Sequence, residues 1–333
     1  MDKYLLNLQL FADPNTQTTE KNDTAGGNDL SPTMKIYYRT QLLENSRNEH
    51  YYAQFGQKQP LPKGEGKKVE WRKFDTFEKA LTPLTEGVTP DGRNINMTRL
   101  EAEIHQYGDY ATISDRLELE AVDPIIALTT EEFGAQAGDT IDTLTRNEVV
   151  TGTHVIYAGG KLSRSAITSS DKLTPTLVDQ AATHLKKMKA PTINGDYVAI
   201  IHPSVSFDLR ESSDWLDVHK YAQPGEIYNG EIGKLHGVRF VESTEAKIFT
   251  GGASDTKVYG TVFLGKDAYG IVEPSAESLE VIVKQRGSAG TSDPLNQRST
   301  VGWKASHAAK ILYQERLVRV ESGSSYGDVD DEN

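Results

Sequence analysis

The sequence predicts an α+β fold with one long helix, a second amphipathic helix and several long strands. Apolar residues recur on one helical face over 124–150. Over 95–113 and 301–313, apolar and polar residues alternate, which is typical of half-buried strands. Only 37% of the 333 residues are hydrophobic, which indicates that arms and loops accompany the core.

The first 68 residues predict an arm. Residues 1–34 are expected to be disordered, because 13–31 hold almost no apolar side chains and cannot bury enough surface to order themselves. The apolar run Tyr4–Ala12 favours a docking segment over a secretory signal, since no small-residue cleavage site follows it. Residues 35–68 are expected to form a helix ending near Gln54 and then a basic connector, which prolines and glycines keep extended. The connector is either a solvated loop or an arm on an acidic surface of another copy.

Residues 69–116 predict an extended β-hairpin. Val69–Phe77 and Ile95–Ile113 would form its strands, and Pro90-Asp91-Gly92 between them is typical of a turn. An isolated hairpin is only marginally stable in water, so a long one implies a partner surface in the same chain or in a neighbour.

Residues 117–172 are expected to be built around the long helix over 124–150. Asp123 would cap this helix, and Pro124 suits its first turn. Residues 275–322 return to long strands. Over 301–313 a helix is the rival prediction, but the alternation fits a strand better. The acidic segment 323–333 is expected to be disordered.

Residues 173–274 predict a compact mixed α/β unit. Its helix is expected to begin with Thr174 as the cap and Pro175 in the first turn, and to end at Pro191. The other expected elements are a buried strand over Tyr197–Ile201, a short helix over Phe207–Trp215, and further strands over Ile232–Val241 and Lys257–Leu264.

No pattern of residues predicts catalysis, a cofactor or a metal site, so we expect a protein that is not an enzyme. The chain has no Cys, and its His residues lack the spacing of a helical metal site. Gly323–Gly327 matches G-x-S-x-G, but no His follows it; Gly260–Lys266 lacks the Ser or Thr of a phosphate loop. His202 is expected to be a hydrogen-bonded strand end, and His307 a hydrogen-bonded core residue.

Charge and hydropathy argue against two further classes. The net charge is −12, whereas proteins that grip duplex DNA normally carry a basic surplus. No stretch approaches the roughly 20 apolar residues that a membrane span needs.

Taken in order, these parts resemble the major capsid proteins of tailed bacteriophages, which share the HK97-like fold. The opening run Leu6–Ala12 is similar to the start of many phage structural proteins. Val198–Pro203 (VAIIHP), followed by Ile232–Val238 (IGKLHGV), resembles the axial-domain strand of that family and a later segment of it. Trp303–Val320 resembles its closing strands. The likeness covers about residues 35–320.

The resemblance implies a domain plan. The parts would be a disordered N-arm (1–34), an N-arm helix and connector (35–68), an extended hairpin loop (69–116), a peripheral domain (117–172, with the spine helix over 124–150, and return strands over 275–322), an axial domain (173–274) and an acidic tail (323–333).

The resemblance also implies a structural role. Hexamers and pentamers of this chain would build an icosahedral shell enclosing double-stranded DNA, in a virion assembled in the bacterial host cytoplasm. Because the arm is shorter than a fused scaffolding segment, a separate scaffolding protein and a portal are the other expected partners. An acidic lining would contact the packaged DNA only weakly, and no membrane partner is expected.

In such a shell the hairpin of each copy would lie over the next copy. Alternating charges along it would supply ion pairs between subunits, each weak in water but repeated around every ring. The subunit-contact candidates are Trp71, Arg72, Lys73, Phe74, Phe77, Arg93, Arg99, Leu100 and Ile104.

Three alternatives belong to other classes. An encapsulin-like nanocompartment would have the same fold around a cargo enzyme. Another phage structural protein, such as a tail or decoration protein, is disfavoured by the long helix. A hydrolase would need a catalytic triad that these motifs do not supply.

Overall fold

The structure is a computed structural model of the chain. It describes residues 51–62, 66–75, 77–84, 86–89, 92–120, 124–213, 215, 231–274, 279–288, 293–326, 330 and 333. The arm expected over 1–34 lies outside these residues, as does most of the helix expected up to Gln54. All described residues belong to one unit, Arg47–Asn333.

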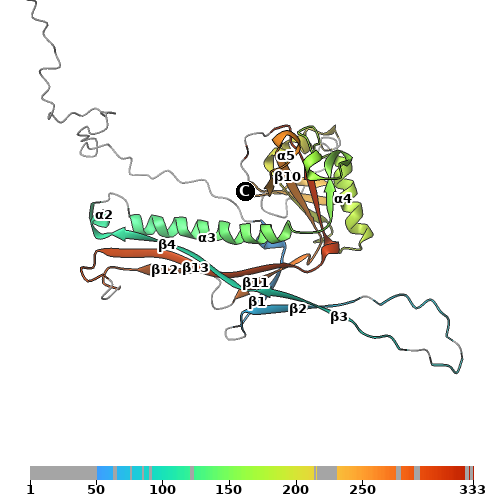
Figure 1. Cartoon of the computed structure of the whole chain (residues 1–333), viewed down its shortest axis with the longest axis horizontal. Coiled ribbons are helices and arrows are strands. Elements are labelled where there is room, and N and C mark those ends of the chain that lie inside the picture. The colour runs from blue at the N-terminus through green and yellow to red at the C-terminus, as the bar shows by residue number, and fades with distance from the viewer. Residues whose placement is uncertain are drawn as a thin grey trace, which may run out of the picture. The chain divides into compact units, whose positions relative to one another are not determined.

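A seven-stranded sheet, here called the axial sheet, has the order β5-β14-β10-β6-β8-β7, with β9 paired to β10. Its strands are β5 (Val155–Tyr157), β6 (Tyr197–Ile201), β7 (Glu231–Leu235), β8 (Val238–Glu242), β9 (Ile248–Phe249), β10 (Val258–Leu264) and β14 (Leu317–Ser322). The helices α4 (Pro175–Lys187) and α5 (Pro203–Arg210) lie beside it (Figure 1). Leu177, Leu185 and Leu209 of these helices share one buried cluster with Phe263 and Val318 of the sheet.

A five-stranded sheet, here called the peripheral sheet, has the order β1-β11-β13-β12, with β4 on the other edge of β13. Its strands are β1 (Gln57–Leu61), β4 (His105–Ser114), β11 (Tyr269–Pro274), β12 (Glu280–Lys284) and β13 (Arg298–Ile311). The long helix α3 (Ile125–Val149) runs along β4 and β13 (Figure 1). Ala137 of α3 packs against Trp303, and Gln136 Oε1 accepts a hydrogen bond from Trp303 Nε1 at 2.8 Å.

The remaining elements are short. A separate two-stranded sheet pairs β2 (Lys68–Phe74) with β3 (Met97–Glu103). The other helices are α1 (Tyr52–Phe55), α2 (Asp115–Glu120) and the 3₁₀ turns η3 (Ala158–Gly160), η4 (Arg164–Ala166), η5 (Ala253–Asp255) and η7 (Gln314–Arg316).

Several predicted elements are confirmed, and the local interactions expected to form some of them are observed. Thr174 Oγ1 accepts a hydrogen bond from the Leu177 N–H at 3.3 Å and so caps α4. The bounds of α3 agree with the helix predicted over 124–150, although Asp123 lies outside the described residues. The segment 301–313 is a strand and not a helix. His307 is buried, and its Nε2 lies 3.1 Å from Thr145 Oγ1, as expected of a core histidine.

The extended hairpin is shorter than predicted. β2 pairs with β3 only over 97–103, and the chain then changes partner. β4 pairs along ten positions of β13, from Ser114↔Arg298 to His105↔His307. Residues 105–114 are therefore part of the peripheral sheet, and the prediction that they form the second hairpin strand was wrong.

Two predictions within 173–274 also need correction. The short helix expected over Phe207–Trp215 begins earlier, at Pro203, because proline suits the first helical turn. The strand expected over Ile232–Val241 is two antiparallel strands, β7 and β8. They are joined at His236 and Gly237, which both have positive φ (51° and 79°), as a tight hairpin turn requires.

The two sheets exchange strands along the chain. β11, expected with the axial unit, pairs with β13 and β1 in the peripheral sheet. β14, expected as a peripheral return strand, pairs with β10 and β5 in the axial sheet. A single buried cluster accordingly holds Tyr52 of α1, Val149 of α3, Val262 of β10 and Ile271 of β11.

Candidate subunit interface

The predicted contact residues at the root of the hairpin turn toward their own chain. Trp71 packs in a cluster with Val69, Ala102 and Val272. A Cβ built on Gly270 of β11 would lie only 2.8 Å from the Trp71 ring, so the glycine is what lets the indole lie on this strand. Leu100 stands opposite Trp71 in the hairpin register, and Ile104 is half-buried in the same cluster.

Lys73 is likewise engaged within its own chain. Its Nζ lies 3.3 Å from Glu315 Oε1 and 4.7 Å from the centre of the Tyr313 ring. The Glu315 carboxylate accepts a hydrogen bond from the Glu315 backbone N–H and another from Lys73. These bonds hold the pKa of Glu315 below its usual range. This contact ties the hairpin to η7, the turn between the two sheets.

The three arginines of the prediction form exposed ion pairs along the hairpin. Glu70 Oε1 lies 2.8 Å from Arg72 Nε and 3.3 Å from Arg99 Nε. Arg93 Nη1 lies 3.3 Å from Glu78 Oε2. Exposed pairs of this kind contribute little to stability, so these guanidinium groups could exchange partners at low cost.

The outer part of the hairpin, between Phe74 and Met97, carries apolar side chains that the described residues leave exposed. Phe74 is 66% exposed and Phe77 57% exposed. The apolar side chains that sequence reasoning missed are Leu81, Leu84, Val88, Ile95 and Met97, which are 44–83% exposed. Their signal was large apolar residues recurring among polar ones on both sides of the Pro90-Asp91-Gly92 turn.

The peripheral sheet has an open groove of about 730 Å³ on the strands β4, β12 and β13. Asp109, Tyr110, Ile282, Lys284 and Arg298 contribute to its lining. Its apolar part is formed by Ile282 and the ring of Tyr110, whereas Val281 and Val283 of β12 alternate with the lining residues and face the other side of the sheet. The groove therefore offers apolar surface together with charges of both signs.

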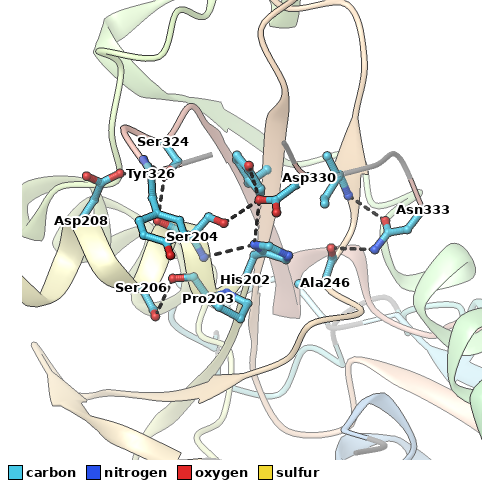
Figure 2. Close-up of polar contacts among 12 residues, drawn as sticks. His202, Pro203, Ser204, Ser206, Asp208, Ala246, Ser324, Tyr326, Asp330 and Asn333 are labelled. Atoms are coloured by element: carbon cyan, nitrogen blue, oxygen red, sulfur yellow. Dashed lines mark hydrogen bonds and ion pairs between the residues drawn. The ribbon is translucent and has the colours of Figure 1, made fainter. Parts of the chain in front are cut away.

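Described residues of the tail that was expected to be disordered are hydrogen-bonded to α5 and to strands of the axial sheet (Figure 2). Asp208 accepts a hydrogen bond from the Ser325 N–H at 2.9 Å and pairs with Lys172 at 2.7 Å. Burial opposes ionisation of Asp208, but Lys172 and the tail serines outweigh it and lower its pKa. The prediction of disorder was wrong for residues 323–326, 330 and 333, because composition alone does not reveal such polar partners.

Further along the tail, Asp330 accepts hydrogen bonds from Ser204 Oγ and Tyr259 Oη, both at 2.6 Å (Figure 2). Burial again opposes ionisation, and these two bonds outweigh it and lower the pKa of Asp330. The side chain of Asn333 bonds the backbone of Ala246 and Ile248.

The polar groups at the tail do not form a hydrolytic site. His202 Nδ1 accepts a hydrogen bond from the Ser204 N–H at 3.2 Å, which confirms a satisfied strand end. Ser204 Oγ and Ser325 Oγ both donate to carboxylates, Asp330 and Asp208, and not to an imidazole. Burial lowers the pKa of His202, and Asp330 only partly offsets this.

Metal binding and membrane spanning find no support in the described residues. These residues contain no group of three or more His, Cys, Asp or Glu that could hold a metal ion. No helix among them is long and apolar enough to cross a membrane.

Comparison with known proteins identifies the family. A model of the phage capsid protein family matches residues 98–320. No curated protein matches the chain. Among solved structures, the chain is similar to the capsid of cyanophage P-SCSP1u, at 15% identity and a TM-score of 0.68, over 92% of this chain and 98% of that chain.

Two further capsids have similar folds. That of Ralstonia phage GP4 has 13% identity and a TM-score of 0.66, over 94% of this chain and 100% of that chain. That of cyanophage Pam1 has 14% identity and a TM-score of 0.68, over 90% and 98%. These likenesses establish the fold. The family match supports the capsid prediction and not the nanocompartment alternative. Because the family model covers more than half of the 333 residues, the chain belongs to the phage capsid protein family, as a major capsid shell protein with a structural role.

Proposed function

We propose that this protein assembles into hexamers and pentamers of an icosahedral shell that encloses the double-stranded DNA of a tailed phage. The observation that carries the proposal is the uncovered apolar surface on the outer hairpin, where Leu81 is 83% exposed and Leu84 78% exposed. A monomer gains nothing from this surface in water, whereas a neighbouring copy would bury it.

The proposed seat for the outer hairpin is the peripheral groove of the next copy. The groove lining supplies apolar surface at Tyr110 and Ile282, and its Lys284 and Arg298 would meet Glu78 and Glu86 of the hairpin. The root residues Trp71 and Lys73 would hold the hairpin to its own subunit. Arg72, Arg93 and Arg99 stay proposed intersubunit contacts, since their present partners are exposed.

The other partners follow from this role as proposals. A separate scaffolding protein and a portal would act during assembly in the host cytoplasm. Packaged DNA would be contacted weakly, because the chain carries a net charge of −12.

The test replaces Leu81 and Leu84 with Ser and follows shell formation by electron microscopy. We expect the double variant to stay unassembled while its thermal unfolding matches that of the parent, because both side chains are exposed. The matched control, Leu81→Met with Leu84→Met, keeps the apolar surface and should assemble. Normal shells from the Ser variant would refute the hairpin contact.

A deletion test must respect the strand pairing. Removing 69–113 would take β4 out of the peripheral sheet and so destroy the fold, whereas removing 77–95 spares every paired strand. We expect this shorter deletion to leave a folded protein that forms no shells.

A further inference from the structure

Two histidines meet where the last turn of α4 lies against the start of β5. The ring centres of His154 and His184 are 5.0 Å apart, and the two rings are tilted by 54°. His184 belongs to the last turn of α4, and His154 comes directly before Val155, the first residue of β5. Two side chains whose charge changes near neutral pH are therefore in contact.

The pair lies where the long helix α3 enters the axial sheet. α3 ends at Val149, and residues 150–154 connect it to β5. The Thr153 N–H donates to Gln314 Oε1 of η7 at 3.0 Å. The His154 carbonyl accepts a hydrogen bond from the Arg319 N–H of β14 at 2.9 Å. This short connection therefore holds both α3 and η7 to the axial sheet.

β5 is the least supported strand at this connection. It has three residues and, within the described part of the chain, pairs with β14 alone. An open groove of about 720 Å³ is lined by all three residues of β5 and, on the first half of α4, by Thr176, Leu177 and Gln180. A short edge strand beside an open groove has few contacts to hold it, so β5 is the strand that we expect to open first.

The surroundings of His184 favour its neutral form. Its Nε2 atom is buried and has no hydrogen-bond partner among the residues that the structure describes. Burial lowers the pKa of His184, and His154 and Lys187 lower it further. The C-terminal end of a helix normally favours a cation, but here burial and the neighbouring cations outweigh that effect.

Charges of both signs surround the pair. They are Lys187 of α4, Glu315 of η7, Lys73 of β2, and Arg319 and Glu321 of β14. Lys73 is paired with Glu315, and Arg319 with Glu321. His154 is close enough to Glu315 to help lower the pKa of that carboxyl group. A first proton is therefore best placed on His154, and a second, on His184, would meet a like charge across the ring contact.

We propose that the His154–His184 pair is an acid-sensitive switch, which holds β5 in the axial sheet at neutral pH and releases it when both rings are protonated. Neutral rings pack against each other, whereas two imidazolium rings at this distance repel. Release of β5 loosens the connection from α3 to the axial sheet. All the residues concerned belong to one chain, so the inference does not depend on shell assembly.

The direction of the pH dependence follows from the protons bound. In the open form both histidines have the ordinary pKa of about 6.5, whereas the closed form takes up the second proton less readily. The closed form is therefore fully favoured above about pH 6.5 and loses stability as the pH falls below that value. One extra proton bound in the open form raises the equilibrium constant for opening by up to about tenfold per pH unit.

Hydrogen exchange of the full-length, unassembled protein tests the switch over about pH 5.5–7.5, after correction for the intrinsic pH dependence of exchange. We expect the protection of residues 151–157 to fall by up to about tenfold between about pH 6.5 and 5.5. The amides of β10, an inner strand of the same sheet, should keep their protection.

Two substitutions remove the titrating ring of α4. His184→Phe keeps a ring against His154, and His184→Gln keeps a polar group. Neither side chain takes up a proton, so in both variants the protection of residues 151–157 should change by less than about twofold over the same pH range.

The matched control is His105→Gln, which removes an exposed histidine from β4. This variant should show the same loss of protection as the parent. Equal protection of residues 151–157 in the parent at both pH values would overturn the proposal. Persistence of the parent's loss in both His184 variants would also overturn it, because the proton would then act elsewhere.

Discussion

Glu321 illustrates how single side chains join the two halves of this subunit. It is fully buried in β14. Arg164 contacts it twice, at 2.8 and 2.7 Å, and Arg319 Nε contacts it at 2.8 Å. Arg319 Nη1 also donates to the carbonyl of Val150 at the C-terminal end of α3, where a cation is favoured by the helix dipole. The carboxylate thereby fixes α3 to the axial sheet.

Removing the charge of Glu321 should be costly. Glu321→Gln leaves two guanidinium groups beside a neutral amide, and we expect the free energy of unfolding to fall by about 3 kcal/mol. This expected loss is at the low end of the range usual for breaking a buried ion pair, because Arg164 is partly exposed to solvent. Urea unfolding monitored by circular dichroism measures the change.

The control for this prediction is Glu120→Gln, which breaks an exposed ion pair with Arg116 on α2. No measurable loss of stability is expected from an exposed pair of this kind. If both variants lost the same small amount, the buried network would not have the role assigned to it.

Among the elements, strand identity was predictable and strand partnership was not. The alternation over 95–113 continues smoothly through Ile104, where β3 ends and β4 begins. Alternation of apolar and polar residues indicates that one face of a strand is buried, but it does not indicate which strand pairs with it. The same limit explains why β14 was assigned to the wrong sheet. The helices α3 and α4 were predicted closely, because the apolar faces of both and the Thr174 cap of α4 are local signals.

The predicted contact residues also divide into those with local signals and those whose partners are distant in the sequence. Phe74 and Phe77 are exposed, which leaves them available to a neighbour. Trp71, another predicted contact residue, packs on Gly270 of its own chain, nearly two hundred positions away in the sequence. Nothing local to Trp71 signals that contact, since the space for the indole is provided by the missing side chain of a distant glycine.

The packing of Trp71 on Gly270 at the root of the hairpin leads to a prediction about how strands β2 and β11 hold together. Gly270→Ala places a Cβ 2.8 Å from Trp71 Cζ2 and 3.3 Å from Leu312 Cδ1, in a packed site. We expect destabilisation by about 1–3 kcal/mol and faster hydrogen exchange in β2. Combining it with Trp71→Leu, which opens space, should cost less than the sum of the two single changes.

Gly134→Ala on α3 is the matched control. Beyond its own stretch of helix, no described atom lies within 4 Å of the added Cβ, and alanine favours the helix by about 1 kcal/mol. The same substitution should therefore raise stability at one site and lower it at the other. A stabilising Gly270→Ala would show that the indole does not depend on this close approach.

At the scale of the whole molecule, the axial and peripheral parts are interleaved. β14 is the last strand in the chain, yet it lies beside β10 inside the axial sheet. Its residues alternate between two cores: Val318 and Val320 belong to the cluster under α4, and Leu317 belongs to the cluster shared with α1, α3 and β11. An axial domain cut out as a continuous piece of sequence would lose this strand.

The expected consequence is that 173–274 does not fold alone. That fragment lacks β14 and exposes Val198, Ile200 and Val262, which the peripheral elements cover in the full chain. Burying such a face is what stabilises the sheet, so the fragment should show no cooperative thermal transition. A chain lacking only residues 1–50 keeps all the described elements and should unfold in one transition, with the amides of β10 and β13 exchanging together. A cooperative melt of the fragment, or two separate transitions in the longer chain, would mean that the shared core does not couple the two sheets.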